Sequence, residues 1–207
     1  MNKEIIPMSE DEMDKLYNSK NPLVRFIHTN RLNQIIKLIK NKENLKILDA
    51  GCGEGHLIQK LQNNIPNNTY YGFDITDIAL EKAKIRCTKA IIEKKDLANT
   101  KTTNDFFDII ICSEVLEHIP EYQEVINELK RILQKDGLLI ITFPNETLWT
   151  VARFFLGRKP IKEPQHVNSF TPNKMKSYIN LKTIKQINLP FRLPFILSLG
   201  SIIKFKK

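Results

Sequence analysis

The chain has 207 residues, 42% of them hydrophobic, and a formal net charge of +9. Its length suits one domain with a sizeable core. Acidic residues in the first 16 positions exclude a signal peptide, and the longest apolar stretch, residues 191–203, falls short of the roughly 20 residues that a membrane-spanning helix needs.

The number and spacing of the cysteines indicate the redox compartment of the protein. Cys52, Cys87 and Cys112 show no metal-ligand spacing and are odd in number, which indicates a reducing compartment. We therefore expect a cytoplasmic protein, soluble or peripheral to a membrane.

The positive charge is concentrated near the C-terminus. Residues 151–207 hold 12 Lys or Arg and one acid, whereas residues 1–150 hold 20 bases and 22 acids. A general abundance of lysine does not explain this asymmetry, so an anionic partner or substrate is a hypothesis to keep.

The first predicted elements are a helix and a buried strand. After a polar stretch, Asn21-Pro22 starts a run of apolar residues at spacings of three and four that predicts a helix to Ile39. Lys46 to Ala50 is typical of a short parallel strand, and three glycines follow it, Gly51, Gly53 and Gly55. Without Cβ atoms these glycines allow a positive φ and the close approach of a ligand. The next helix presents free N–H groups that suit an anion.

The spacing of the glycine loop separates two kinds of ligand. A dinucleotide fold requires G-x-G-x-x-G, but here the third glycine position holds His56. The observed pattern is G-x-G-x-G, with Asp49 two residues ahead of it. A second short β-rich run ends in Asp74, 23 residues after Gly51. A carboxylate at that position can accept both hydrogen bonds of a ribose diol, as an adenosine ligand would require.

The stretch from Asp49 to Gly55 resembles the first motif of class I S-adenosylmethionine-dependent methyltransferases. A third strand, residues 90–92, leads to Asp96, which resembles the family residue that hydrogen-bonds the adenine amino group. Arg31 lies 18 residues before Asp49, and in quinone O-methyltransferases and their relatives an arginine at a similar distance meets the methionine carboxylate. A solvated helix arginine is the alternative. The resemblance covers residues 21–180 and implies S-adenosylmethionine as the cofactor, bound by Arg31, Asp49, Gly51, Cys52, Gly53, Gly55, Asp74, Ile75, Asp96, Leu97 and Ser113.

The catalytic candidates follow the predicted fourth strand, residues 106–112. Ser113 to Pro120 resembles the fourth motif of the same superfamily and contains Glu114, Glu117 and His118. On a helix, Glu114 and His118 would share a face at i, i+4. His118 can then act as a general base, or the three, with His166, can bind a divalent metal as the E-x-x-E-H pattern of metal-assisted quinone and small-RNA 2′-O-methyltransferases implies. Pocket architecture without catalysis is the third alternative, and no metal ligand is assigned.

The rest of the chain completes the predicted fold. A helix at 122–133, a stop at 135–137 and a strand at 138–143 are followed by a helix at 148–156, a loop at 157–165, a helix at 171–179 and two antiparallel strands at 181–189 and 202–205. The alternation predicts an α/β fold with a doubly wound, mostly parallel seven-stranded sheet and helices on both faces. We expect one domain, 1–207, with a helical cap at 1–45, a cofactor-binding core at 46–145, and an acceptor-side insertion with closing strands at 146–207.

The function implied by the resemblance is methylation of an oxygen on a small-molecule or lipid-linked acceptor. RNA methylation is the alternative, favoured by the basic C-terminal segment but by no RNA-binding motif. A cofactor-binding subunit without catalysis is a further alternative, and His56 disfavours a nicotinamide oxidoreductase. Apolar residues flanked by Arg192 and Lys204 to Lys207 suggest docking on an anionic membrane surface, although closing strands of the sheet explain them more simply.

Overall fold

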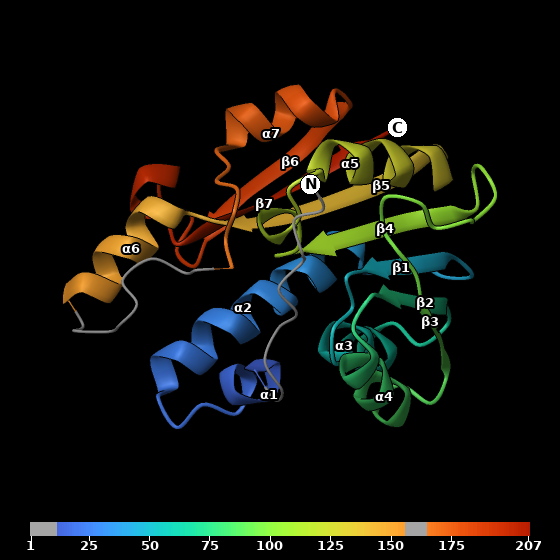
Figure 1. Cartoon of the computed structure of the whole chain (residues 1–207), viewed down its shortest axis with the longest axis horizontal. Coiled ribbons are helices and arrows are strands. Elements are labelled where there is room, and N and C mark those ends of the chain that lie inside the picture. The colour runs from blue at the N-terminus through green and yellow to red at the C-terminus, as the bar shows by residue number, and fades with distance from the viewer. Residues whose placement is uncertain (1–11, 156–164) are drawn as a thin grey trace.

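The computed structural model describes residues 12–155 and 165–207, so the predicted loop at 157–165 lies outside the described residues except for Gln165. Seven strands form one sheet in the order β3-β2-β1-β4-β5-β7-β6 (Figure 1). Every strand pair is parallel except those of β7, which runs antiparallel to β5 and β6. The predicted fold class and its closing antiparallel strands are therefore confirmed. The strands are β1 Lys46–Ala50, β2 Thr69–Asp74, β3 Ala90–Lys94, β4 Phe107–Ser113, β5 Leu133–Pro144, β6 Lys182–Leu189 and β7 Gly200–Lys206.

Helices cover both faces of this sheet because alternate strand residues point to opposite sides. Ile47 and Ile109 pack with residues of α2, α3 and α4, whereas Leu48 and Ile110 pack with residues of α5 and α7. The central strands β1 and β4 are buried on both faces, as their continuous apolar runs predicted. The α-helices are α1 Glu12–Tyr17, α2 Pro22–Ile39, α3 His56–Asn64, α4 Asp77–Arg86, α5 Tyr122–Ile132, α6 Glu146–Phe155 and α7 Pro172–Ile179, with short 3-10 helices η1 Leu116–His118 and η2 Phe195–Leu197.

One predicted turn is part of a strand. Lys135-Asp136-Gly137 was expected to stop the helix before β5, but α5 already ends at Ile132 and β5 starts at Leu133. Phe107 of β4 pairs with Leu133 and Ile109 pairs with Leu138, so the extra residues form a bulge within β5. Asp136 takes the positive φ of 62° that the bulge requires. The turn residues therefore bend a strand that continues past them.

The C-terminal segment divides into a core strand and an exposed connection. Ile202, Ile203 and Phe205 are fully buried in β7, so these apolar residues form a closing strand of the sheet, which was the simpler explanation for them. Lys206 pairs with Asp136 at 2.8 Å and Lys207 with Asp105 at 2.8 Å, so acids distant in the sequence accompany two of the lysines on which the docking hypothesis relied. The apolar residues of the β6–β7 connection are exposed instead. Among the described residues, no helix is both long and apolar enough to cross a membrane.

Candidate active site

The glycine loop turns sharply at the carboxyl end of β1. Gly51, Gly53 and Gly55 have φ values of 79°, 49° and 83°, the left-handed region that glycine adopts without strain. A Cβ on Gly51 would lie 2.4 Å from a methyl carbon of Val115, so that position has no room for a side chain. Apart from Gly53 and its two chain neighbours, no atom of the described protein lies within 4 Å of a Cβ built on Gly53, which leaves its backbone open for a ligand to approach.

Asp74, at the end of β2, holds the glycine loop from the neighbouring strand. Its Oδ2 accepts the N–H of Gly53 at 2.8 Å, and its Oδ1 accepts the N–H of Thr76 at 2.9 Å. Each carboxylate oxygen retains a second lone pair, so these bonds leave acceptors for a ribose diol. Thr76 occupies the N-cap position of α4 as predicted, but its side chain makes no capping bond.

A cavity beside the glycine loop brings together residues from β1, β4, α2 and α1. Among the residues that line it, the predicted cofactor ligands are Arg31, Asp49, Gly51, Cys52 and Ser113. Arg31 is buried and its Nη1 lies 3.0 Å from Glu114 Oε2, while its Nε has no hydrogen-bond partner among the described residues. Burial, and next the charge of Asp74, raise the pKa of Asp49 well above its ordinary value. The cavity thus pairs a buried cation with an acid, an arrangement that suits the carboxylate and ammonium of an amino acid.

The remaining predicted cofactor ligands do not line this cavity. Ile75 is exposed directly after β2, and Asp96 is exposed after β3, where its Oδ1 accepts the N–H of Ala98 in a local turn at 2.9 Å. The Leu97 side chain is buried in the core and packs with the α5 face of the sheet. Their place at the carboxyl ends of β2 and β3 agrees with an adenosine site along the same edge, and their contacts to a cofactor stay a prediction.

Helix α1, which lies within the helical cap expected at 1–45, closes the cavity, although none of its residues is among the predicted site residues. Asp14 Oδ1 lies 2.7 Å from Arg86 Nη2 and 3.0 Å from His56 Nε2, and the Asp14 N–H donates to Glu54 Oε2 at 3.1 Å. Tyr17 packs against His56 with ring centroids 4.5 Å apart and the rings tilted by 37°, and it lines the cavity. We call Asp14, Glu54, His56 and Arg86 the α1 latch. Arg86 and Lys82 already supply positive charge to Glu54 and Asp14, which disfavours a metal ion there.

The acidic and histidine motif after β4 is not a helix face. Only Leu116–His118 forms a single 3-10 turn, and Glu114 takes a φ of 58° before it. This left-handed residue sends the two acids in different directions. Glu114 binds Arg31, which lines the cofactor cavity, and accepts a hydrogen bond from Thr142 Oγ1 at 2.8 Å. The i, i+4 pairing of Glu114 with His118 is therefore wrong.

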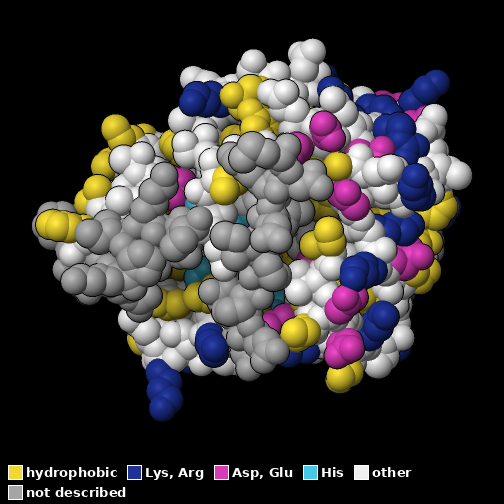
Figure 2. All heavy atoms as spheres, viewed as in Figure 1, with side chains coloured by type: hydrophobic (Ala, Val, Ile, Leu, Met, Phe, Trp, Pro, Cys, Tyr) yellow, Lys and Arg dark blue, Asp and Glu magenta, His cyan; other side chains and the backbone are white. Residues whose placement is uncertain are grey.

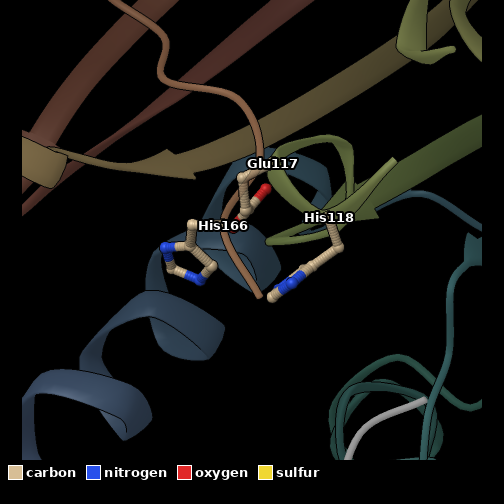
Figure 3. A group of neighbouring side chains, drawn as sticks. All are labelled: Glu117, His118 and His166. Carbon is tan, nitrogen blue, oxygen red and sulfur yellow. The ribbon is translucent and has the colours of Figure 1, made fainter. Parts of the chain in front are cut away.

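Glu117, His118 and His166 come together instead (Figure 3). Each offers one ligand atom, and these atoms lie within 4.8 Å of one another. The rings of His118 and His166 stand edge to face with centroids 4.7 Å apart. Glu117 is 1% exposed, and neither carboxylate oxygen has a hydrogen-bond partner among the described residues. Burial, and next the charge of Glu114, raise the pKa of Glu117 well above its ordinary value.

A second cavity, of about 320 Å³, adjoins this cluster. His166 lines it together with Glu146, Thr150 and Val151 of α6. His166 Nδ1 lies 2.6 Å from Glu146 Oε1, and His118 Nδ1 lies 3.2 Å from the carbonyl oxygen of Gln165. Since a carboxylate and a carbonyl accept hydrogen bonds, Nδ1 is the donor in both histidines, and the neutral tautomer with this proton has Nε2 as its acceptor.

The residues present fit the groups that the fold family implies. The open backbone at Gly53, the acceptors of Asp74 and the unpartnered Arg31 Nε suit S-adenosylmethionine. The unpartnered Glu117 and the two imidazoles form a donor set that a divalent metal can use. Arg31 Nε and the carboxylate oxygens of Glu117 are buried without a hydrogen-bond partner among the described residues. The cofactor would supply a partner for Arg31, and the metal would supply one for Glu117.

Several site residues escaped sequence reasoning. Thr142 lies in the middle of an apolar run, Glu146 opens an amphipathic helix, and Tyr17 belongs to a short polar helix, so none of them has a local pattern that marks a site. Glu54 carried one usable signal, because it stands inside the glycine loop next to residues already assigned. The partners of Asp14, at positions 54, 56 and 86, are too far along the chain for spacing to reveal them.

Comparisons with known proteins identify the family of this chain. A family model described as a methyltransferase domain matches residues 41–186. The ubiquinone biosynthesis O-methyltransferase of Haemophilus ducreyi is 33% identical over 112 residues, which cover 50% of this chain and 47% of that protein. The homologous enzyme of Rickettsia typhi is 30% identical over 163 residues, or 70% and 63% of the two chains. The chain thus matches about half to two thirds of the length of these curated relatives.

A solved structure shows the same fold. The magnesium protoporphyrin IX methyltransferase of Synechocystis, determined with S-adenosylhomocysteine bound, superposes with a TM-score of 0.74 over 95% of this chain and 93% of the other, at 19% identity. At that identity the likeness concerns the fold alone. The family model, however, spans most of this chain, including the glycine loop and the acids that follow it. The chain therefore belongs to the class I S-adenosylmethionine-dependent methyltransferases.

Proposed function

We propose that the protein transfers a methyl group to a hydroxyl oxygen of a small-molecule or lipid-linked acceptor bound in the cavity beside α6. The observation that carries the proposal is the cluster of His118, His166 and Glu117 at that cavity, next to the Arg31–Glu114 pair of the cofactor cavity. Relatives named as ubiquinone biosynthesis O-methyltransferases support oxygen as the methylated atom.

The residues divide the work between binding and proton removal. When bound, S-adenosylmethionine supplies a sulfonium methyl that is already electrophilic, so alignment and deprotonation of the acceptor remain for the protein. Arg31 and Asp49 hold the amino-acid end, and Asp74 accepts from the ribose. His166 Nε2 takes the proton of the acceptor hydroxyl. Glu146 fixes the tautomer that makes this possible and stabilises the imidazolium that forms.

A divalent cation is a second candidate for activating the hydroxyl. It is favoured by Glu117, a buried carboxylate without a partner among the described residues and close to two imidazole acceptors. The cation would be held by Glu117, His118 and His166 and would lower the pKa of a hydroxyl bound beside it. A histidine base needs no added metal, whereas a reaction that depends on a bound cation stops when a chelator removes it. One experiment therefore distinguishes the two mechanisms.

The experiment measures transfer of a labelled methyl group from S-adenosylmethionine to a panel of hydroxylated aromatic and polyprenylated acceptors, with transfer RNA as a further substrate. His166→Asn should lower turnover by at least about 100-fold while the affinity for S-adenosylhomocysteine stays unchanged, and His118→Asn should do the same if the cation is used. Activity lost with a chelator and restored by magnesium or manganese would assign the metal role. Wild-type turnover in both variants, or label found only in RNA, would contradict the proposal.

A further inference from the structure

Six large apolar side chains are exposed on two segments at one side of the molecule. They are Leu23 and Phe26 of α2, and Phe191, Leu193, Ile196 and Leu197 of the β6–β7 connection, and we call them the apolar surface. Ile196 is 76% exposed and Phe191 66%. Hydrophobic side chains gather along the left edge of Figure 2, the side on which Figure 1 shows α6 and the start of α2. Exposed apolar residues that cluster in this way mark an interaction surface.

The two segments are neighbours in space, and the connection is firmly held. The rings of Phe26 and Phe191 stack with centroids 6.1 Å apart. The carbonyl of Leu193 accepts from Asn188 Nδ2 at 2.9 Å and from Ser198 Oγ at 3.0 Å, and Asn145 Nδ2 donates to the carbonyl of Phe195 at 2.8 Å. These bonds fix the backbone in a shape that turns the apolar side chains outward.

The two segments that carry the apolar surface hold charges of one sign. Residues 15–42 and 182–207 contain no acid. Arg25 and Arg192, both exposed, stand next in sequence to Phe26 and Phe191, the two rings that stack. Apolar side chains interleaved with bases are the combination that an anionic lipid surface attracts, because the side chains enter the headgroup region while the bases meet lipid phosphates.

The apolar surface continues to the proposed acceptor cavity through α6. Asn145, just ahead of α6, binds the connection through Phe195 and Ser198. Val151 lines the cavity and is 44% exposed, and Phe154 lies exposed nearly one turn further along the helix. We propose that the apolar surface docks the protein on an acidic lipid bilayer. An acceptor anchored in that bilayer would then reach the cavity along α6. This access of the acceptor rests on the proposed function, whereas the docking itself does not.

The test is co-sedimentation of the full chain with vesicles of phosphatidylcholine, with and without added phosphatidylglycerol, at low and high salt. The wild type should bind the acidic vesicles at low salt and lose most of that binding at high salt. The double variant Phe191→Ser/Ile196→Ser should partition at least about tenfold less. Ile85→Ser is the matched control, because Ile85 is 80% exposed on α4, far from the apolar surface in sequence, and it should bind like the wild type.

The charge arm uses Arg25→Gln/Arg192→Gln, which should weaken binding to acidic vesicles by about tenfold or more, against Lys84→Gln/Lys89→Gln as control. Affinity for S-adenosylhomocysteine, measured on every variant, shows that each has folded and keeps this result separate from the outcome of the methylation assay. Equal binding to neutral and acidic vesicles, or binding to neither, would overturn the proposal. So would self-association of the wild type that the Phe191→Ser/Ile196→Ser variant abolishes, which would make the surface a contact between copies.

Discussion

Glu117 is a carboxylic acid buried away from water. Its carboxyl group is buried, no hydrogen-bond partner meets it among the described residues, and burial followed by the charge of Glu114 raises its pKa well above 4.5. A raised pKa in the folded state means that the folded chain holds this proton more tightly than the unfolded chain does. The stability that results is fully present below the ordinary pKa and is lost as the pH rises through the folded value.

Glu117→Gln should therefore flatten part of the pH dependence of stability. Glutamine has a similar shape but cannot ionise, so without metal the variant should become more stable than the wild type as the pH rises, by about 1 kcal/mol or more. Thermal unfolding followed from about pH 5 to about pH 9 in the presence of a chelator measures the difference. Parallel curves for the two proteins would contradict a neutral, buried Glu117.

At the same scale, the sequence drew attention to the acids and the histidine after β4 but did not predict the directions of their side chains. Glu114, Glu117 and His118 stand together in the chain, and a helical spacing pairs the first with the last. The positive φ of Glu114 breaks that spacing and turns its side chain towards Arg31. A non-glycine residue in this region is strained, and nothing local in the sequence announces it.

At the scale of elements, α1 is the part that depends most on distant contacts. Its six residues are too few for a stable isolated helix, so the latch and the packing of Tyr17 hold it over the cofactor cavity. Burial alone would raise the pKa of Asp14, but the hydrogen bond and charge of Arg86, with the charge of His56, bring it below its ordinary value. The latch is thus favoured above the ordinary pKa of Asp14 and weakens as the pH falls through the folded value.

Asp14→Asn should loosen α1 and speed the release of S-adenosylhomocysteine by several-fold. The variant lacks the negative charge of Asp14, the common partner of Arg86 and His56. Stopped-flow dissociation measures this rate. Asp77→Asn is the matched control, since it breaks an ion pair with Lys94 in which both side chains are largely exposed, and it should leave the rate unchanged. An equal effect of both substitutions would contradict a closing role for α1.

Elements with strong periodic patterns were predictable, and α1 was not. The helix from Pro22 to Ile39 and the strand before the glycine loop both follow from apolar spacing and turn residues. Helix α1 has no such pattern, because its partners come from the glycine loop and from α4. Likewise β5 continues through Asp136 and Gly137, since pairing with β4 and β7 outweighs the local preference for a turn.

At the scale of the whole molecule, the sheet was predictable because strands and helices alternate five times in the sequence. The basic C-terminal segment was harder to interpret. Lys206 and Lys207 pair with Asp136 and Asp105, which are distant in the sequence, so acids outside the segment balance part of its positive charge. Some apolar residues of this segment are buried in β7, and others are exposed in the connection before it. The structure distinguishes these two groups, whereas the sequence does not.

The central claim is that the carboxyl edge of β1, β2 and β4 binds S-adenosylmethionine. Asp74 and Asp108 each accept a backbone N–H at 2.8 Å, but Asp108 does so near the opposite end of the strands, where it binds Lys46. Asp74→Asn should therefore weaken cofactor binding, and Asp108→Asn provides a control with the same chemical change.

Calorimetric titration with S-adenosylhomocysteine tests the claim most directly. The wild type should bind one equivalent, Asp74→Asn should bind it roughly 10- to 150-fold more weakly, and Asp108→Asn should stay within about twofold of the wild type. Failure of the wild type to bind, equal affinity in the two variants, or tight binding of NADH in its place would contradict the account.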